Sequence, residues 1–309
     1  MTHPRLPILM KLSNLFLLVI ACACTALGIY SCKKTSSYST MQPSDFTPTH
    51  AGQYIIYRLD STIFVNFGTQ QQTVSYLVKD VVDASITDNL GRPGWRIFRY
   101  ISDTALSSDW SPLETYLVTP TRQNVELLDN NLRFIQLTLP ITNNYSWPGN
   151  SYLPDNPLGS LYDFSDPEHT NWSSWNYTYQ DVNTSNTYNG KSYDSTITVL
   201  QIDDSISRPL FGSKTYWKEK YAPHIGLIYK EVKMWEYQAS YIVSNCYYVN
   251  CSQPVCDTVD CTLYPNNCTL ISQLPVDQLQ NWTEHCRDSV QSGLYYIGYG
   301  VKMTIVDHN

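Results

Sequence analysis

Two carboxylates and an imidazole adjoin in the sequence at Asp166, Glu168 and His169. Together they could carry out general acid–base catalysis, or their oxygens could bind a cation. Residues adjacent in sequence seldom point at one atom, and no partner for them is recognisable elsewhere in the chain. We therefore expect a solvated loop here, and we keep a hydrolase that uses these loop carboxylates as the alternative.

Other signatures of catalysis are missing from the sequence. Ser61 and Ser195 each follow an aspartate, but neither lies in the Gly-x-Ser-x-Gly pattern of a nucleophile elbow, and no glycine-rich phosphate loop is present. Five lysines lie close together on one predicted hairpin, and we interpret them as a solvated strand face: Lys214, Lys218, Lys220, Lys230 and Lys233. The sequence predicts no catalytic residue, metal or cofactor.

The segment 140–181 has no regular periodicity and is rich in proline, asparagine and aromatic residues. Loops this long are usually functional or disordered, and so many aromatic residues argue against disorder. Trp147, Trp172 and Trp175 either cap an open barrel end or stand exposed as stacking surfaces for sugar rings. We favour the cap, and we keep the three tryptophans as candidate ligand-binding residues.

Six cysteines lie in the segment 245–290, namely Cys246, Cys251, Cys256, Cys261, Cys268 and Cys286. In an exported chain an even number of cysteines in one short segment is typical of disulfides, and their connectivity stays open. The spacing does not match the paired ligands of a zinc site. Apolar residues at Val276, Leu279 and Trp282 follow a helical spacing that continues to Val290, so we also expect a short helix in this insert.

The N-terminus has the features of a secretion signal. Arg5 and Lys11 precede an apolar run over 15–30 without an acidic residue. A serine stands directly before Cys32 and an isoleucine two places before that serine, which is the pattern cut by a peptidase that acts before a lipid-modified cysteine. We expect residues 1–31 to be a signal peptide and Cys32 to carry lipid such as palmitate.

Two alternatives to this anchor remain open. Cys22 also follows a small residue and an aliphatic one, although cleavage there would retain a second apolar stretch. An uncleaved anchor helix is the other, because the apolar run is at the lower limit for a span. All three interpretations tether the chain to a membrane at its N-terminus. We expect a lipid-anchored protein of the bacterial cell envelope, at the periplasmic or surface side of the outer membrane. Residues 32–50 are rich in serine, threonine and proline and predict a flexible linker.

The composition agrees with an exported β-rich domain. Without residues 1–31 the chain keeps 18 lysines and arginines against 27 acids, a formal charge of −9, which argues against nucleic acid as a partner. Charged residues make up only 15% and there are 25 tyrosines, which is typical of β-rich surfaces. Seven Asn-x-Ser/Thr sequons leave a eukaryotic glycoprotein as a weaker interpretation: Asn144, Asn171, Asn176, Asn183, Asn250, Asn267 and Asn281.

Alternation of apolar and polar residues predicts antiparallel strands along most of the chain. Odd positions from Ile55 to Phe67 are mainly apolar and even positions mainly polar, as expected for a long strand with one buried face. Residues 129–131 and the pair Asn189-Gly190 predict tight hairpin turns, and Leu294 to Val306 predicts a last strand. No helical pattern of ten residues interrupts the first strands, which disfavours a parallel sheet.

Four stretches resemble envelope lipoproteins of the Bacteroidota: Ser31-Cys-Lys-Lys34, Gly52 to Ser61, Asn189-Gly190 and Tyr221 to Glu231. The resemblance covers less than a fifth of the chain. It implies an envelope lipoprotein with an antiparallel β body, and it brings no catalytic or binding residue. The cysteine-rich insert departs from that pattern.

The sequence therefore predicts one all-β domain over 51–309. We expect a curved antiparallel sheet that closes into a partial barrel, like a lipocalin or a lipoprotein-carrier half-barrel, because the strands are long; a two-sheet sandwich is the alternative. The expected function is non-enzymatic binding of an apolar (lipid) ligand, a glycan or an envelope partner. A purely structural surface protein is a further alternative.

Overall fold

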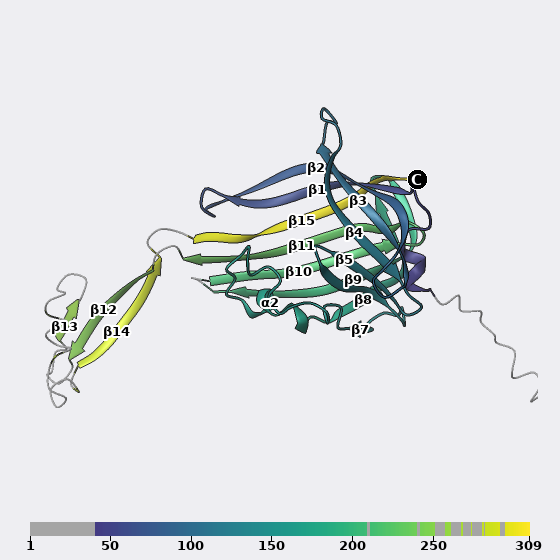
Figure 1. Cartoon of the computed structure of the whole chain (residues 1–309). Helices are drawn as coiled ribbons and strands as arrows, with labels where there is room; N and C mark the ends of the chain where they lie inside the picture. Colours follow the sequence, from purple (N-terminus) through teal and green to yellow (C-terminus); the bar gives the residue numbers. More distant parts are fainter. Residues whose placement is uncertain are drawn as a thin grey trace, which may run out of the picture. The chain divides into compact units, whose positions relative to one another are not determined.

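The computed structural model describes residues 41–309, apart from 209–210, 240–241, 251–256, 261–266, 268–272, 274–279, 281 and 291–293. The predicted signal peptide, most of the predicted linker and both candidate lipid-bearing cysteines, Cys22 and Cys32, lie outside these residues. The described residues form a 12-stranded sheet and a 3-stranded sheet (Figure 1). Among them, no helix combines the length and apolar character that crossing a membrane requires.

The 12-stranded sheet consists of two meanders joined through the last strand. Its order is β6-β5-β4-β3-β2-β1-β15-β11-β10-β9-β8-β7, and β15 pairs with both β1 and β11. The strands are β1 (Tyr54–Val65), β2 (Gln70–Thr87), β3 (Pro93–Asp103), β4 (Ser111–Pro120), β5 (Asn124–Asp129), β6 (Leu132–Thr138), β7 (Ser146–Trp147), β8 (Tyr177–Tyr188), β9 (Lys191–Ser207), β10 (Phe211–Ala222), β11 (Gly226–Ala239) and β15 (Leu294–His308). All of these pairings are antiparallel.

The two edges of this sheet meet, so the sheet is nearly closed into a barrel. Ile135 of β6 donates its backbone N–H to the Gly149 carbonyl, and its own carbonyl accepts the indole N–H of Trp147, both at 2.8 Å. The Tyr179 hydroxyl also bridges the backbone N–H and C=O of Thr138. The predicted curved sheet is confirmed, and closure uses isolated bonds rather than a continuous ladder.

The turns between the strands follow their sequence signals. Asn189 and Gly190 have φ values of 48° and 76°, the left-handed conformation that the two-residue hairpin between β8 and β9 requires. Asn130 and Asn131, with φ values of 49° and 62°, connect β5 to β6 in the same way. Both predicted hairpins are confirmed.

The alternation expected for the first strand holds only for its first half. Ile55 and Tyr57 are buried, but Ile63 is 38% exposed and Phe67 is fully exposed. The strand ends at Val65, and Phe67 lies in the following turn with a φ of 57°. The prediction of a strand through Phe67 is wrong, because apolar alternation alone cannot show where a sheet stops covering its strand.

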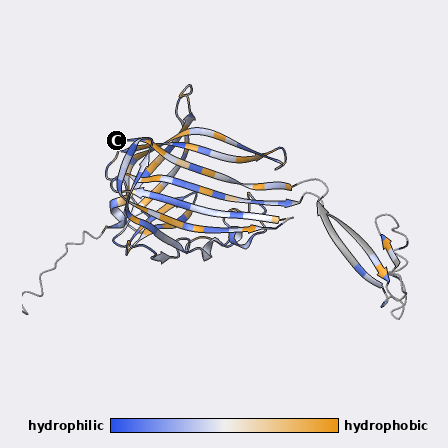
Figure 2. Cartoon of the chain, turned by 180° about the vertical axis from the view of Figure 1, so that it is seen from behind, coloured by the Kyte–Doolittle hydropathy of each residue, from blue (hydrophilic) through white to orange (hydrophobic). Residues whose placement is uncertain are grey.

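The interior side of the sheet carries the hydrophobic core, and hydrophilic and hydrophobic residues alternate along the strands (Figure 2). One cluster joins the aromatic loop to strands β5, β6 and β8 to β11, and includes Leu137, Trp172, Tyr177, Val199 and Met234. A second cluster joins β1, β2, β11 and β15 through Tyr57, Val78, Ile228 and Ile305. The 3-10 helix η1 (Pro43–Phe46) adds Phe46 to the first cluster.

The 3-stranded sheet has the order β13-β12-β14, and lies in the chain between β11 and β15. Its strands are β12 (Ile242–Asn250), β13 (Asp257–Asp260) and β14 (Trp282–Val290). The helix expected to reach Val290 is wrong from Trp282 on, because pairing with β12 overrides a helical spacing that rests on a few apolar residues. Cys251, Cys256, Cys261 and Cys268 lie outside the described residues.

Candidate functional site

The interior of the barrel is filled differently along its length. On β10, Ser213 bonds to Asp166 of the aromatic loop and Trp217 packs against the loop's Trp172. Further along the same strand, Glu219 and Tyr221 line a cavity instead. The aromatic loop therefore fills the interior at one end of β10, and open space remains toward the other end.

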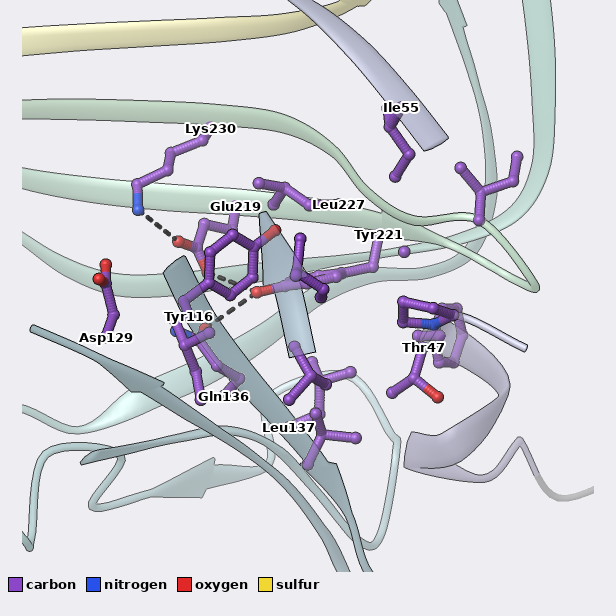
Figure 3. A pocket seen from close by; sticks show the side chains of 18 of the residues that line it. Thr47, Ile55, Tyr116, Asp129, Gln136, Leu137, Glu219, Tyr221, Leu227 and Lys230 are labelled. Carbon is purple, nitrogen blue, oxygen red and sulfur yellow. Dashed lines mark hydrogen bonds and ion pairs between the residues drawn. The ribbon is translucent and has the colours of Figure 1, made fainter. Parts of the chain in front are cut away.

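The cavity at this second end has a volume of about 110 Å³ (Figure 3). Strands from both meanders and the helix η1 supply its apolar walls: Phe46, Ile55, Ile97, Val125, Leu137 and Leu227. These residues converge because their strands alternate, which turns one face of each toward the interior. Small-molecule sites typically have such mainly apolar walls with a few polar groups.

A second void of about 350 Å³ adjoins the cavity and has an apolar side formed by Leu59, Val78, Val232, Val301 and Met303. Arg99, Asp129 and Lys230 line both spaces. These three charged residues therefore lie where the two spaces adjoin. The space of about 110 Å³ is called the inner cavity below, and the space of about 350 Å³ the outer void.

Arg99 belongs to a row of charges that crosses three strands. Asp80 on β2, Arg99 on β3 and Glu114 on β4 stand opposite one another in the strand register. Arg99 donates to both Asp80 oxygens, at 2.6 and 2.8 Å, and to Glu114 at 2.6 Å. Burial acts to lower the pKa of Arg99, but the Asp80 carboxylate outweighs it and the pKa is raised well above its usual value. Each of the three nitrogens of this arginine therefore donates to a carboxylate.

Tyr116 completes that row. Its hydroxyl donates to Asp80 at 2.8 Å, and its ring lies 5.0 Å from the Arg99 guanidinium. Burial, followed by the Asp80 charge, raises the pKa of Tyr116 well above its usual value. The phenol therefore stays a neutral donor, and the row is a network of charges paired with one another.

Glu219 is the centre of a second network. It is only 2% exposed, and it accepts hydrogen bonds from Gln201 at 3.2 Å and from the Trp217 indole at 3.0 Å. The Tyr221 hydroxyl lies 2.5 Å from Glu219, and the Lys230 ammonium lies 3.3 Å from it. Figure 3 shows the contacts of Glu219 with Tyr221 and Lys230 beside the cavity.

Asp129 differs from the other carboxylates of the site. Its Oδ1 is out of contact with solvent and has no hydrogen-bond partner among the described residues. Burial, with a further contribution from Glu114, raises the pKa of Asp129, while Lys230 and Arg99 act in the opposite direction. Asp129 and Lys230 extend from opposite walls toward the same space (Figure 3).

The three tryptophans of the aromatic loop are buried, with exposures of 5% for Trp147 and 2% for Trp172 and Trp175. Trp172 stacks on Trp175 with ring centroids 4.8 Å apart, and both pack against Trp217. Each indole N–H donates to a backbone carbonyl. This burial is what a cap requires, and sugar binding by these residues stays a prediction that only a binding measurement tests.

The acid–base group of the sequence is buried in the same loop, where Asp166 caps the short helix α2 (Pro167–Thr170). His169 is fully buried; its Nδ1 lies 2.9 Å from Glu236 Oε1 and its Nε2 lies 3.2 Å from the Lys214 carbonyl oxygen. The expectation of a solvated loop is wrong, because these polar groups are bonded to β10 and β11.

Glu236 of β11 is the residue that fixes this loop, and it was not singled out from the sequence. It accepts backbone N–H groups of Ser165 and Asp166, at 2.7 to 2.9 Å, besides the bond to His169. Burial would raise the pKa of Glu236, but the bonds from His169 and from the backbone outweigh it and lower the pKa. The cluster is therefore saturated, and a substrate has no access to it.

Lys230 also departs from the sequence analysis. It was interpreted as part of a solvated face, yet its side chain is 22% exposed and stands over the Trp217 ring at 4.5 Å. The available signal was its position, because Lys230 lies two residues from the buried Ile228 and two from the buried Val232, on the same face of the strand. A charged residue on the apolar face of a strand indicates a polar site in the interior. Asp80, which lies between Val78 and Val82 on one strand face, is a second example.

Within the residues that the structure describes, no three His, Cys, Asp or Glu side chains are grouped so that they could hold a metal ion. No protein-family model and no curated protein matches the chain. Among solved structures, it is similar to a protein from Bacteroides fragilis NCTC 9343 described as exported and as having a YMCC-like fold. The identity is 15% and the TM-score 0.29, and the match covers 61% of this chain and 91% of that chain. A TM-score this low does not establish a common fold, so the site is interpreted from its own geometry alone.

Proposed function

We propose that the protein is a non-enzymatic binding protein of the bacterial envelope that holds a small apolar ligand inside its barrel. The observation that carries this proposal is the apolar inner cavity with its adjoining void of about 350 Å³, a volume within the range of about 300 to 1,000 Å³ typical of small-molecule sites.

The pairing of the carboxylates supports binding rather than catalysis. A hydrolase needs carboxylates that converge on a substrate with unused bonding capacity. Asp80 and Glu114 are paired with Arg99, Glu219 with Lys230, and Glu236 with His169. For the remaining carboxylate of the cavity wall, Asp129, the buried Oδ1 has no hydrogen-bond partner among the described residues.

Binding of a fluorescent apolar dye tests this proposal. The domain from residue 41 on should bind N-phenylnaphthylamine, with saturable enhancement of its fluorescence. Val301→Trp, which fills the outer void, should weaken this binding about tenfold or more, since the indole replaces the ligand there. The matched control is Ile63→Trp, at an exposed position of β1, which should bind as the wild type.

Failure of the wild type to bind the dye, or equal binding by Val301→Trp, would show that the interior is not a ligand site. Circular dichroism of both variants separates loss of binding from loss of folding. A stabilising apolar competitor found in lipid extracts of the native host would give the ligand's identity.

We propose further that the chain reaches the envelope as a lipoprotein anchored through Cys32. The support is the signal-like segment over 1–31 and the serine-rich linker after it. Metabolic labelling with palmitate should mark the full-length chain, and Cys32→Ser should abolish the label while Cys22→Ser retains it. Label that survives Cys32→Ser would move the anchor to another residue.

The cysteine-rich insert is proposed to hold three disulfides. The backbone register sets Cys246 of β12 directly opposite Cys286 of β14, and opposed residues on paired antiparallel strands have Cα atoms about 4.5 to 5.5 Å apart, within the range that a disulfide spans. Non-reducing peptide mapping should therefore recover a Cys246–Cys286 cross-link. Free thiols at both positions would contradict the proposal.

A further inference from the structure

One buried side-chain oxygen in the described wall of the two interior spaces has no hydrogen-bond partner. Arg99 directs an N–H from each of its three nitrogens at Asp80 or Glu114, and Tyr116 donates its hydroxyl to Asp80. Asp129 keeps a buried oxygen without a partner in the described structure. A buried polar atom without a partner costs about 1 to 3 kcal/mol, so its retention calls for an explanation.

Lys230 supplies the matching donor. An ammonium group has three N–H donors. One is directed at Glu219, at the long distance of 3.3 Å, and the group stands over the Trp217 ring. At least one donor is therefore available to a molecule in the cavity. Lys230 and Asp129 line both the inner cavity and the outer void, so a ligand that occupies either space reaches them.

We propose that Asp129 and Lys230 bind the polar end of the ligand, and that this end is a neutral group such as a hydroxyl or a primary amide. This inference rests on the proposed function. The group must donate to Asp129 and accept from Lys230, and a hydroxyl or an amide does both. The apolar remainder of the molecule then lies against Leu127 in the inner cavity or Val301 in the outer void.

The local charges disfavour an ionised ligand. A carboxylate or phosphate would accept from Lys230 but would face the Asp129 oxygen and the nearby Glu114 and Glu219. An ammonium group would donate to Asp129 but would face Lys230 and Arg99. In a space of low dielectric, either like-charge contact is unfavourable. The site therefore selects by charge, and this gives a ligand class of fatty alcohols, monoacylglycerols and fatty amides rather than fatty acids.

Competition among ligands with one common chain tests this selectivity. Decanol, decanamide, decanoate and decylamine should each be titrated at pH 7 against the bound N-phenylnaphthylamine. Decanol and decanamide should compete about tenfold more strongly than the two ions, the effect of roughly one hydrogen bond. Because the wild type itself shows the preference, the test does not depend on any variant folding.

Two variants locate the selectivity. Asp129→Leu and Lys230→Met should each reduce the preference for decanol over the two ions. The matched control for the lysine is Lys233→Met, on the exposed face of the same strand, where the side chain is 48% exposed. It should retain the order of the wild type.

The outcomes separate this inference from the proposed function. If Val301→Trp blocks dye binding but decanoate competes as well as decanol, interior binding stands and the assignment of a neutral group is overturned. An unchanged preference in both Asp129→Leu and Lys230→Met would overturn it as well. Absence of dye binding in the wild type would instead remove the proposed function.

Discussion

Two carboxylates of the barrel interior, Glu236 and Asp129, differ in their hydrogen bonding and in the direction of their pKa shifts. Glu236 at the loop-filled end has its oxygens saturated by His169 and by two backbone N–H groups, and its pKa is lowered. Asp129 at the cavity has an unpartnered oxygen and a raised pKa. A saturated buried carboxylate fixes the packing of its surroundings, whereas an unsaturated one is able to bind something further.

This difference assigns a structural role to the loop end of the barrel and a binding role to the cavity end. The loop end is a polar cluster enclosed by aromatic rings, and its removal should cost stability. The cavity end contains the unpartnered Asp129 oxygen, and its removal should weaken ligand binding without lowering stability. Each expectation can be measured on a single substitution.

The largest effect is expected at Glu236. Glu236→Leu leaves the His169 imidazole and the N–H groups of Ser165 and Asp166 buried without a partner, which should lower the free energy of unfolding by about 3 to 5 kcal/mol. Urea denaturation measures it. The control Glu231→Leu lies on the same strand with partly exposed partners, and it should cost less than about 1 kcal/mol. Equal losses in the two variants would contradict a special role for the cluster.

Trp172→Ala should be nearly as damaging, by about 3 to 4 kcal/mol, because it opens a void beside Trp175 and Trp217. Thermal unfolding measures the loss, and Trp95→Ala on a half-buried position of β3 should lose less. If Trp172→Ala melts with the wild type and instead loses retention on polysaccharide gels, the loop binds glycans and does not act as a cap.

Much of this fold could be predicted from the sequence, because strands with one buried face repeat with a period of two and asparagine–glycine turns have a fixed backbone conformation. The interior charges could be predicted only in part. Lys230 and Asp80 reveal themselves by their place among buried apolar neighbours. Their partners could not be predicted, since the pairing of Arg99 with Asp80 depends on the register of two strands, and that of Glu236 with His169 on the docking of a loop 67 residues away.

Glu236 at the loop end should contribute to the pH dependence of stability. The pKa of Glu236 is lower in the folded chain than its usual 4.5, so the ionised form stabilises the fold above that pH. This contribution is lost as the pH falls from 4.5 through the lower folded value. The free energy of unfolding should therefore fall less steeply in Glu236→Gln than in the wild type below about pH 4.5. Parallel curves would show that the pKa of Glu236 is the same in the folded and the unfolded chain, and would contradict the stabilising role of its ionised form.

The smallest effect, and the one of opposite sign, is expected at Asp129. Its pKa is raised from 3.8 by burial, so above that pH ionisation costs more in the folded chain than in the unfolded chain. Asp129→Asn has the same shape without the charge, and it should raise the free energy of unfolding at pH 7 by about 0.5 to 1 kcal/mol. The gain should disappear below pH 3.8, because Asp129 is then protonated in both states. Asp203→Asn, at a side chain 49% exposed, should show no such gain. A loss of stability in Asp129→Asn at pH 7 would mean that the carboxylate already has a stabilising partner, and it would remove the reason to assign this oxygen to a ligand.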